Sequence, residues 1–292
     1  MECVERKIQG AHGLSLNLVE WSRDGVPMLL LHGYSNEAHI WDDFVPMVSS
    51  HYRVLALDLR GHGESDWHPE GAYRYEDHVE DVEAVVEALG IDRVVVVGHS
   101  LGGRIAMLYG GRNPDRLAGL VIVDSAPELD ARGTVRISME AAENQDPSFR
   151  SLAEFEQFLV HLYPAATAAS IRRMAEHGVK QRESDGRWIL KMDTAFRRAV
   201  SGDDASMSRE EFEREQNESR EAMWAALEKI PCPTLVVRGA ASDVLSPEIA
   251  DRMAEETLPR GHLAIVARAG HSVMTDNPEG FNAALAEFVL GE

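Results

Sequence analysis

The sequence has 292 residues, of which 44% are hydrophobic and 27% charged, as is typical of a globular chain that buries its own core. Its two cysteines, Cys3 and Cys232, are too few for a disulfide framework or a zinc-finger spacing, and they fit a reducing compartment. The formal net charge of −20 argues against nucleic acid as a partner, because phosphates would be repelled. No signal peptide and no bilayer-spanning apolar run is evident, so we expect a cytoplasmic monomer or homodimer without membrane contact.

Residues 1–126 alternate short apolar runs with segments of helical periodicity. The apolar runs predict strands at Val26–Leu31, Tyr52–Leu57, Arg93–Val97 and Leu117–Val123. Helices are predicted at Asp77–Leu89 and Leu101–Arg112. An alternation of strands and helices implies a mostly parallel, doubly wound sheet covered by helices, which is an α/β fold.

The pattern changes after Pro127, where charged residues, methionines and helical periodicity dominate. Helices are predicted there at Ser151–Leu162, Ala165–His177 and Glu210–Lys229. Strands return at Thr234–Val237 and His262–Ala267, followed by a closing helix at Phe281–Leu290. The sequence therefore predicts one core domain, made of residues 1–127 and 231–292, with a helical cap inserted at 128–230. Because ligands bind at the carboxyl ends of parallel strands, we expect this cap to lie over the site.

The segment Gly98-His99-Ser100-Leu101-Gly102 matches the pattern G-x-S-x-G of a nucleophile elbow. A buried-strand pattern precedes it and a helical pattern follows, which is the context that the motif requires. The turn strains the backbone at Ser100, so its neighbours must be small, and the helix N-terminus favours developing negative charge. The alternative is a glycine-rich connection without chemistry; in this context we predict that Ser100 is a nucleophile.

A serine hydroxyl needs a general base, and a carboxylate must hold that base in one tautomer. His271 is the best candidate for the base, because it follows the last predicted strand and completes the chain order serine, acid, histidine. Two aspartates follow strands at suitable places, Asp124 after Leu117–Val123 and Asp243 after Thr234–Val237. Either loop could reach the imidazole.

The tetrahedral intermediate of acyl transfer carries a negative charge that needs preorganised donors. The amide of Leu101, directly after the nucleophile, is one expected donor. The amide of Tyr34, in the loop that follows the first buried strand, is the other, with Gly33 allowing close approach.

Taken together, the motifs resemble the α/β-hydrolase superfamily, in the branch with a helical lid between strands six and seven. The matching segments are His32-Gly33-Tyr34, Asp58 to Ser65, Gly98 to Gly103, Val123 to Pro127, Gly239 to Asp243 and Gly270-His271-Ser272. The triad acid of that family usually follows strand seven, so the resemblance favours Asp243, with Asp124 as the alternative acid or as a brace for the start of the insertion. The resemblance implies no metal and no organic cofactor.

The expected function is hydrolysis of a carboxylic ester or lactone by a Ser-His-Asp triad through an acyl-enzyme intermediate. The partner would be a small-molecule substrate, and the long polar cap leaves room for a bulky one such as a macrocyclic lactone (a macrolide). One alternative is hydrolysis of a C–C bond in a diketone on the same triad. The other is a non-catalytic ligand-binding protein on this fold.

Overall fold

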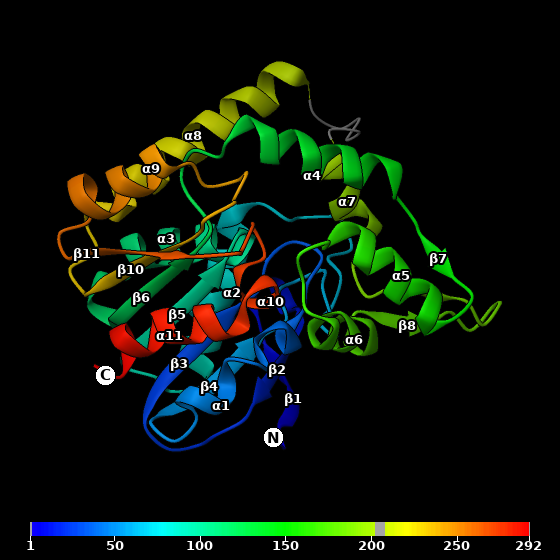
Figure 1. The fold of residues 1–292 in the computed structure, drawn as a ribbon, viewed down its shortest axis with the longest axis horizontal. Helices are drawn as coiled ribbons and strands as arrows, with labels where there is room; N and C mark the ends of the chain where they lie inside the picture. The colour runs from blue at the N-terminus through cyan, green and yellow to red at the C-terminus, as the bar shows by residue number, and fades with distance from the viewer. Residues whose placement is uncertain (1, 202–207, 292) are drawn as a thin grey trace.

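The computed structural model describes residues 2–201 and 208–291. Within these ranges a central sheet of eight strands has the order β1-β2-β4-β3-β5-β6-β10-β11 (Figure 1). Its strands are β1 (Val4–Gln9), β2 (Ser15–Glu20), β3 (Val26–Leu31), β4 (Tyr52–Leu57), β5 (Val94–His99), β6 (Leu117–Val123), β10 (Thr234–Gly239) and β11 (Gly261–Val266). The pairs β1–β2 and β2–β4 are antiparallel and the other pairs are parallel. The predicted mostly parallel sheet is therefore confirmed, and β1 and β2 extend it by two strands that were not predicted.

The helices lie on both faces of this sheet and in the segment between β6 and β10. They are α1 (Val45–Val48), α2 (Tyr75–Ala88), α3 (Leu101–Arg112), α4 (Ala131–Glu143), α5 (Leu152–Leu162), α6 (Ala168–His177), α7 (Thr194–Ser201), α8 (Arg209–Leu227), α9 (Pro247–Asp251), α10 (Val273–Asp276) and α11 (Pro278–Val289). Short turns of 3₁₀-helix include η2 (Ala38–Trp41). In the part of the chain that the structure describes, no helix combines the length and the apolar composition needed to cross a membrane.

The parallel strands are buried on both sides, and alternate residues feed two separate hydrophobic clusters. In β3, Leu29 and Leu31 belong to one cluster, which the helices α2, α3 and α8 cover. Met28 and Leu30 belong to the other cluster, which α1, α10 and α11 cover. Successive residues face opposite sides of the sheet and both sides are buried. The strands therefore appear in the sequence as continuous apolar runs.

The insertion leaves the sheet after β6 and returns at β10. In Figure 1 its helices α4 to α7 lie to the right of the sheet, whereas α8 runs back across the top. The insertion also holds a small antiparallel sheet of order β7-β9-β8, formed by Ser148–Phe149, Trp188–Leu190 and Val179–Gln181. These strands were not predicted, because segments of two or three residues leave no periodicity to read. The cap boundaries at 128 and 230 stay a prediction, and residues 202–207 lie outside the described ranges.

The α8 helix packs on the core helix α3. A side chain added at Gly111 of α3 would bring its Cβ within 2.4 Å of Ala226 Cβ, so glycine permits the close approach. Met223, Leu227 and Ile230 are buried in the same cluster as the sheet. Their apolar stripe therefore packs in the core.

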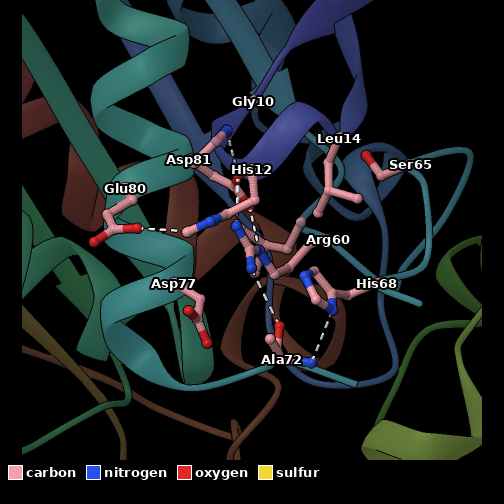
Figure 2. A network of polar contacts seen from close by, with 12 residues as sticks. Gly10, His12, Leu14, Arg60, Ser65, His68, Ala72, Asp77, Glu80 and Asp81 are labelled. Carbon is pink, nitrogen blue, oxygen red and sulfur yellow. Dashed lines mark hydrogen bonds and ion pairs between the residues drawn. The ribbon is translucent and has the colours of Figure 1, made fainter. Parts of the chain in front are cut away.

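Behind the sheet edge, Arg60 and Asp81 form a buried ion pair (Figure 2). Arg60 Nε and Nη2 donate to the two carboxylate oxygens of Asp81 over 2.6 and 2.8 Å, and Nη1 donates to the Ala72 carbonyl. Both side chains are at most 1% exposed. The pair connects the segment that begins at Asp58 to α2.

Candidate active site

The elbow around Ser100 joins the end of β5 to the start of α3. Ser100 has φ 52° and ψ −111°, a strained conformation for a residue with a side chain. A Cβ on Gly98 would lie 2.3 Å from the Gly102 carbonyl oxygen, and one on Gly102 would lie 2.3 Å from that of Leu31. The prediction that these neighbours must be small is confirmed, because the backbone segments touch at the turn.

Ser100, His271 and Asp124 lie in a hydrogen-bonded row at the carboxyl ends of the strands. The Ser100 Oγ atom is 3.0 Å from His271 Nε2, and His271 Nδ1 is 2.8 Å from Asp124 Oδ2. His271 is 14% exposed and Asp124 is fully buried. The hydroxyl, the imidazole and the carboxylate thus have the connectivity of a nucleophile, a base and a group that orients the base.

Asp124 follows β6 directly, and its backbone and its partners fix its carboxylate. Its φ is 45°, a left-handed value that the surrounding structure must enforce. The carboxylate accepts hydrogen bonds from the Gly239 amide over 3.0 Å and from the Ser242 hydroxyl over 2.6 Å. His271 is the third partner, so both oxygens of this buried carboxylate take part in hydrogen bonds.

Asp243, which the family resemblance favoured as the acid, does not contact His271. Its carboxylate receives two hydrogen bonds from the Arg136 guanidinium of α4, over 2.6 and 2.9 Å. Arg136 accordingly holds the pKa of Asp243 below its ordinary value. The choice of Asp243 over Asp124 was therefore wrong: the loop after β10 turns its Ser242 side chain, not the next residue, toward the site.

His99, the second residue of the elbow, contacts the loop that carries His271. Its Nε2 donates to the His271 carbonyl oxygen over 2.9 Å, and the two rings lie 4.8 Å apart. Burial lowers the pKa of His99 well below its ordinary value, so the ring stays neutral. This contact was not predicted from the sequence, because only the folded chain brings His99 and the loop after β11 together.

The loop after β3 lies against the nucleophile. A Cβ added at Gly33 would come within 2.6 Å of His99 Nδ1 and 3.2 Å of Ser100 Cβ. Within residues 2–201 and 208–291, neither the Tyr34 amide nor the Leu101 amide donates to a protein acceptor. The loop that carries Tyr34 thus lies against Ser100, and the role of the Tyr34 and Leu101 amides as oxyanion donors stays a prediction.

An apolar pocket opens beside that loop, between the core and the insertion. Its polar lining includes Ser35, Asn36 and Glu37 after Tyr34, and Lys191 of the insertion. The apolar wall comes from the insertion and includes Phe155, Phe158, Leu159, Leu162, Met174 and Met192. None of these residues was singled out from the sequence, because helical periodicity does not distinguish a pocket wall from a core face.

Charged side chains of the insertion also approach the Tyr34 loop. The Arg197 guanidinium lies 6.0 Å from the centre of the Tyr34 ring and 3.8 Å from the Glu140 carboxylate. Arg197 is buried, and its Nε has no hydrogen-bond partner among the described residues. Because a buried unpaired donor is costly, this guanidinium is held in place by its other contacts, to the Asn144 carbonyl and the Ser35 hydroxyl.

The fold described above is that of the α/β-hydrolase family, and the chain belongs to this family. The family model for the alpha/beta hydrolase fold matches residues 26–278. The match covers every strand from β3 to β11 together with Ser100, Asp124 and His271. The predicted fold class is thereby confirmed, and the chain is a hydrolase of this family.

Several relatives match along nearly the whole chain. The esterase Rv0045c of Mycobacterium tuberculosis is 30% identical over 99% of this chain and 88% of its own length. The 2-(acetamidomethylene)succinate hydrolase of Mesorhizobium japonicum is 27% identical over 94% of this chain and 92% of its own. The crystal structure of an E-2-(acetamidomethylene)succinate hydrolase has a TM-score of 0.83 at 24% identity, over 99% of both chains, and so shares the fold.

Proposed function

We propose that this chain is a serine hydrolase that cleaves carboxylic esters with Ser100, His271 and Asp124. The observation that carries the proposal is the hydrogen-bonded row from the Ser100 hydroxyl through His271 to the buried Asp124. An isolated serine is a weak nucleophile, and the row supplies a base within reach and a carboxylate that orients it. The esterase from Mycobacterium, similar over nearly the whole chain, supports the choice of an ester bond.

In the first step His271 Nε2 takes the proton of Ser100 as the hydroxyl oxygen attacks the ester carbonyl carbon. The oxyanion is stabilised by the amides of Tyr34 and Leu101. Collapse of the intermediate breaks the bond to the alkoxide oxygen, which leaves as the alcohol with the proton from His271. The same histidine then deprotonates a water molecule, whose oxygen attacks the acyl-enzyme and releases the acid and Ser100.

An apolar group of the substrate would contact the apolar wall of the pocket beside the Tyr34 loop. Phe155, Phe158 and Leu159 offer that group an apolar surface, and the pocket begins one residue after the proposed oxyanion donor. Burial of each methylene there contributes about 0.8 kcal/mol. Lactones share the ester bond and stay within the proposal, whereas the macrocyclic lactone remains a prediction from the length of the insertion.

Two assays on the purified protein test the proposal. A fluorophosphonate, which phosphonylates an activated serine, is expected to label the wild type once, on the peptide that contains Ser100, and to leave Ser100→Ala unlabelled. The wild type is expected to hydrolyse p-nitrophenyl esters and Ser100→Ala to lose this activity. Absence of labelling would favour a ligand-binding protein. Labelling without ester hydrolysis, together with cleavage of a diketone, would favour the C–C hydrolase.

A further inference from the structure

Three potential metal ligands converge at the edge of the sheet, away from the triad. Cys3 directly precedes β1 and Glu5 is the second residue of that strand, so in extended chain their side chains point to the same side. His39 comes from η2, which follows the Tyr34 loop. The Cys3 Sγ, a carboxylate oxygen of Glu5 and a ring nitrogen of His39 all lie within 4.8 Å of one another.

The His39 ring is held in the orientation that a metal ligand requires. Its Nδ1 lies 3.2 and 3.3 Å from the two carboxylate oxygens of Asp42, which leaves Nε2 directed at the Glu5 carboxylate, 3.6 Å away. The Asp42 carboxylate on Nδ1 orients the ring, and a metal that binds at Nε2 takes the place of the proton that faces Glu5. The Glu37 carboxylate also fixes η2, because it accepts the His39 amide over 2.8 Å.

We propose that Cys3, Glu5 and His39 form a site for a divalent transition metal of the zinc class. Sulfur, imidazole nitrogen and carboxylate oxygen are the three donor types that zinc accepts, and three protein ligands leave a fourth position for water. The site opens to solvent at Glu5, whose side chain is 48% exposed and can close on the ion, while His39 is rigid and buried. This site lies outside the proposed ester-hydrolysing centre and does not depend on it.

The His177 ring is not part of the ligand set. It stacks on His39 with ring centres 3.8 Å apart and planes 21° apart. A metal bound to His39 Nε2 lies in the plane of that ring, and a stacked ring presents its face rather than a nitrogen lone pair to that position. His177 ends α6, so this stack connects the proposed site to the insertion.

His39 also lies within reach of one ion together with Glu37 and His177, a group that has no sulfur ligand. A third group of side chains offers a matched control. His12, Asp77 and Glu80 also lie within reach of one ion, and Figure 2 shows them beside α2. This group has no sulfur ligand, and His12 Nε2 already lies 2.7 Å from Glu80 Oε2. Binding there would give no sulfur-to-metal absorption, which separates the two sites in one experiment.

The test is titration of the purified wild-type protein with Co²⁺, followed by absorption spectroscopy. We expect a thiolate-to-cobalt charge-transfer band at one equivalent, with the visible bands of tetrahedral cobalt, and loss of both on addition of Zn²⁺. Cys3→Ser is expected to abolish the charge-transfer band, whereas Cys232→Ser and His12→Gln keep it. A charge-transfer band that persists in Cys3→Ser, or none in the wild type with excess Co²⁺, would overturn the proposal.

The role of Asp42 is tested separately. Asp42→Asn is expected to retain the charge-transfer band but to weaken Co²⁺ binding about tenfold, since it removes the carboxylate that orients His39. Circular dichroism of each variant shows whether it folds. An unchanged affinity in folded Asp42→Asn would contradict the orienting role of this residue.

Discussion

His271 Nδ1 lies 2.8 Å from Asp124 Oδ2, so the carboxylate at the end of β6 orients the imidazole. The loop after β10 still takes part, because its Gly239 amide and Ser242 hydroxyl both donate to Asp124. Two neighbouring strands thus act together, since the acid follows β6 and the donors that hold its carboxylate come from the end of β10 and the loop after it.

Ser242→Ala removes the hydroxyl that donates to Asp124 over 2.6 Å. A hydrogen bond to a charged group contributes about 1.5–3 kcal/mol, so we expect kcat for an ester to fall roughly tenfold or more with KM little changed. Ser242→Thr retains a hydroxyl and is expected to recover most of the loss. Steady-state kinetics of the two variants check this; equal losses in both would mean that Ser242 acts only through packing.

Asp81→Asn leaves the Arg60 guanidinium buried without its counter-charge. Breaking a buried ion pair on one side costs about 3–5 kcal/mol, and we expect a loss of that size in the free energy of unfolding measured with urea. Glu87→Gln, at the exposed pair with Arg116, is the control and should cost less than about 1 kcal/mol. Similar losses of unfolding free energy in the two variants would show that burial does not make the Arg60–Asp81 pair more important for stability.

His62 is fully buried, and burial lowers its pKa from 6.5 to about 3. Below pH 6.5 the unfolded chain binds a proton there that the folded chain does not, so stability falls as the pH falls from 6.5 toward 3. The slope from one such group is about 1.4 kcal/mol per pH unit. We expect His62→Gln to flatten the pH dependence of the unfolding free energy by about this slope between pH 6 and pH 4.

Urea unfolding at a series of pH values measures that slope directly. The exposed His51 provides the control, because His51→Gln removes a histidine that water already solvates. A slope unchanged in His62→Gln, or changed equally in His51→Gln, would show that His62 does not carry the effect.

Phe158→Ala enlarges the apolar pocket beside the Tyr34 loop. We expect kcat/KM for short p-nitrophenyl esters to fall a few-fold and the preferred acyl chain to lengthen, because the cavity then accepts additional methylenes. A series of esters from acetate to decanoate measures the change. Phe212→Ala, on the exposed surface of α8, serves as the control. An identical chain-length profile in both variants would show that the pocket does not bind the acyl chain.

The elements and the nucleophile elbow could be predicted from the sequence, because apolar runs and small residues at a tight turn are visible in it. The predicted bounds of β3, β4, β6 and α3 match the structure, and the elbow glycines are required by close backbone contacts at the turn around Ser100. The acid was misassigned because Asp124 and Asp243 both follow strands, and only the tertiary structure pairs Asp243 with Arg136. The short strands of the insertion and the pocket wall likewise depend on contacts between distant segments.

The most direct test of the proposed mechanism compares Asp124→Asn with Asp243→Asn in one ester assay, with the folding of both confirmed. Asp124→Asn is expected to lower kcat by about 10³–10⁴-fold, because the amide no longer holds the imidazole in the required tautomer. Asp243→Asn, which only weakens an ion pair with the half-exposed Arg136, is expected to lower kcat less than tenfold. The reverse ranking would contradict the assignment of Asp124 as the partner of His271.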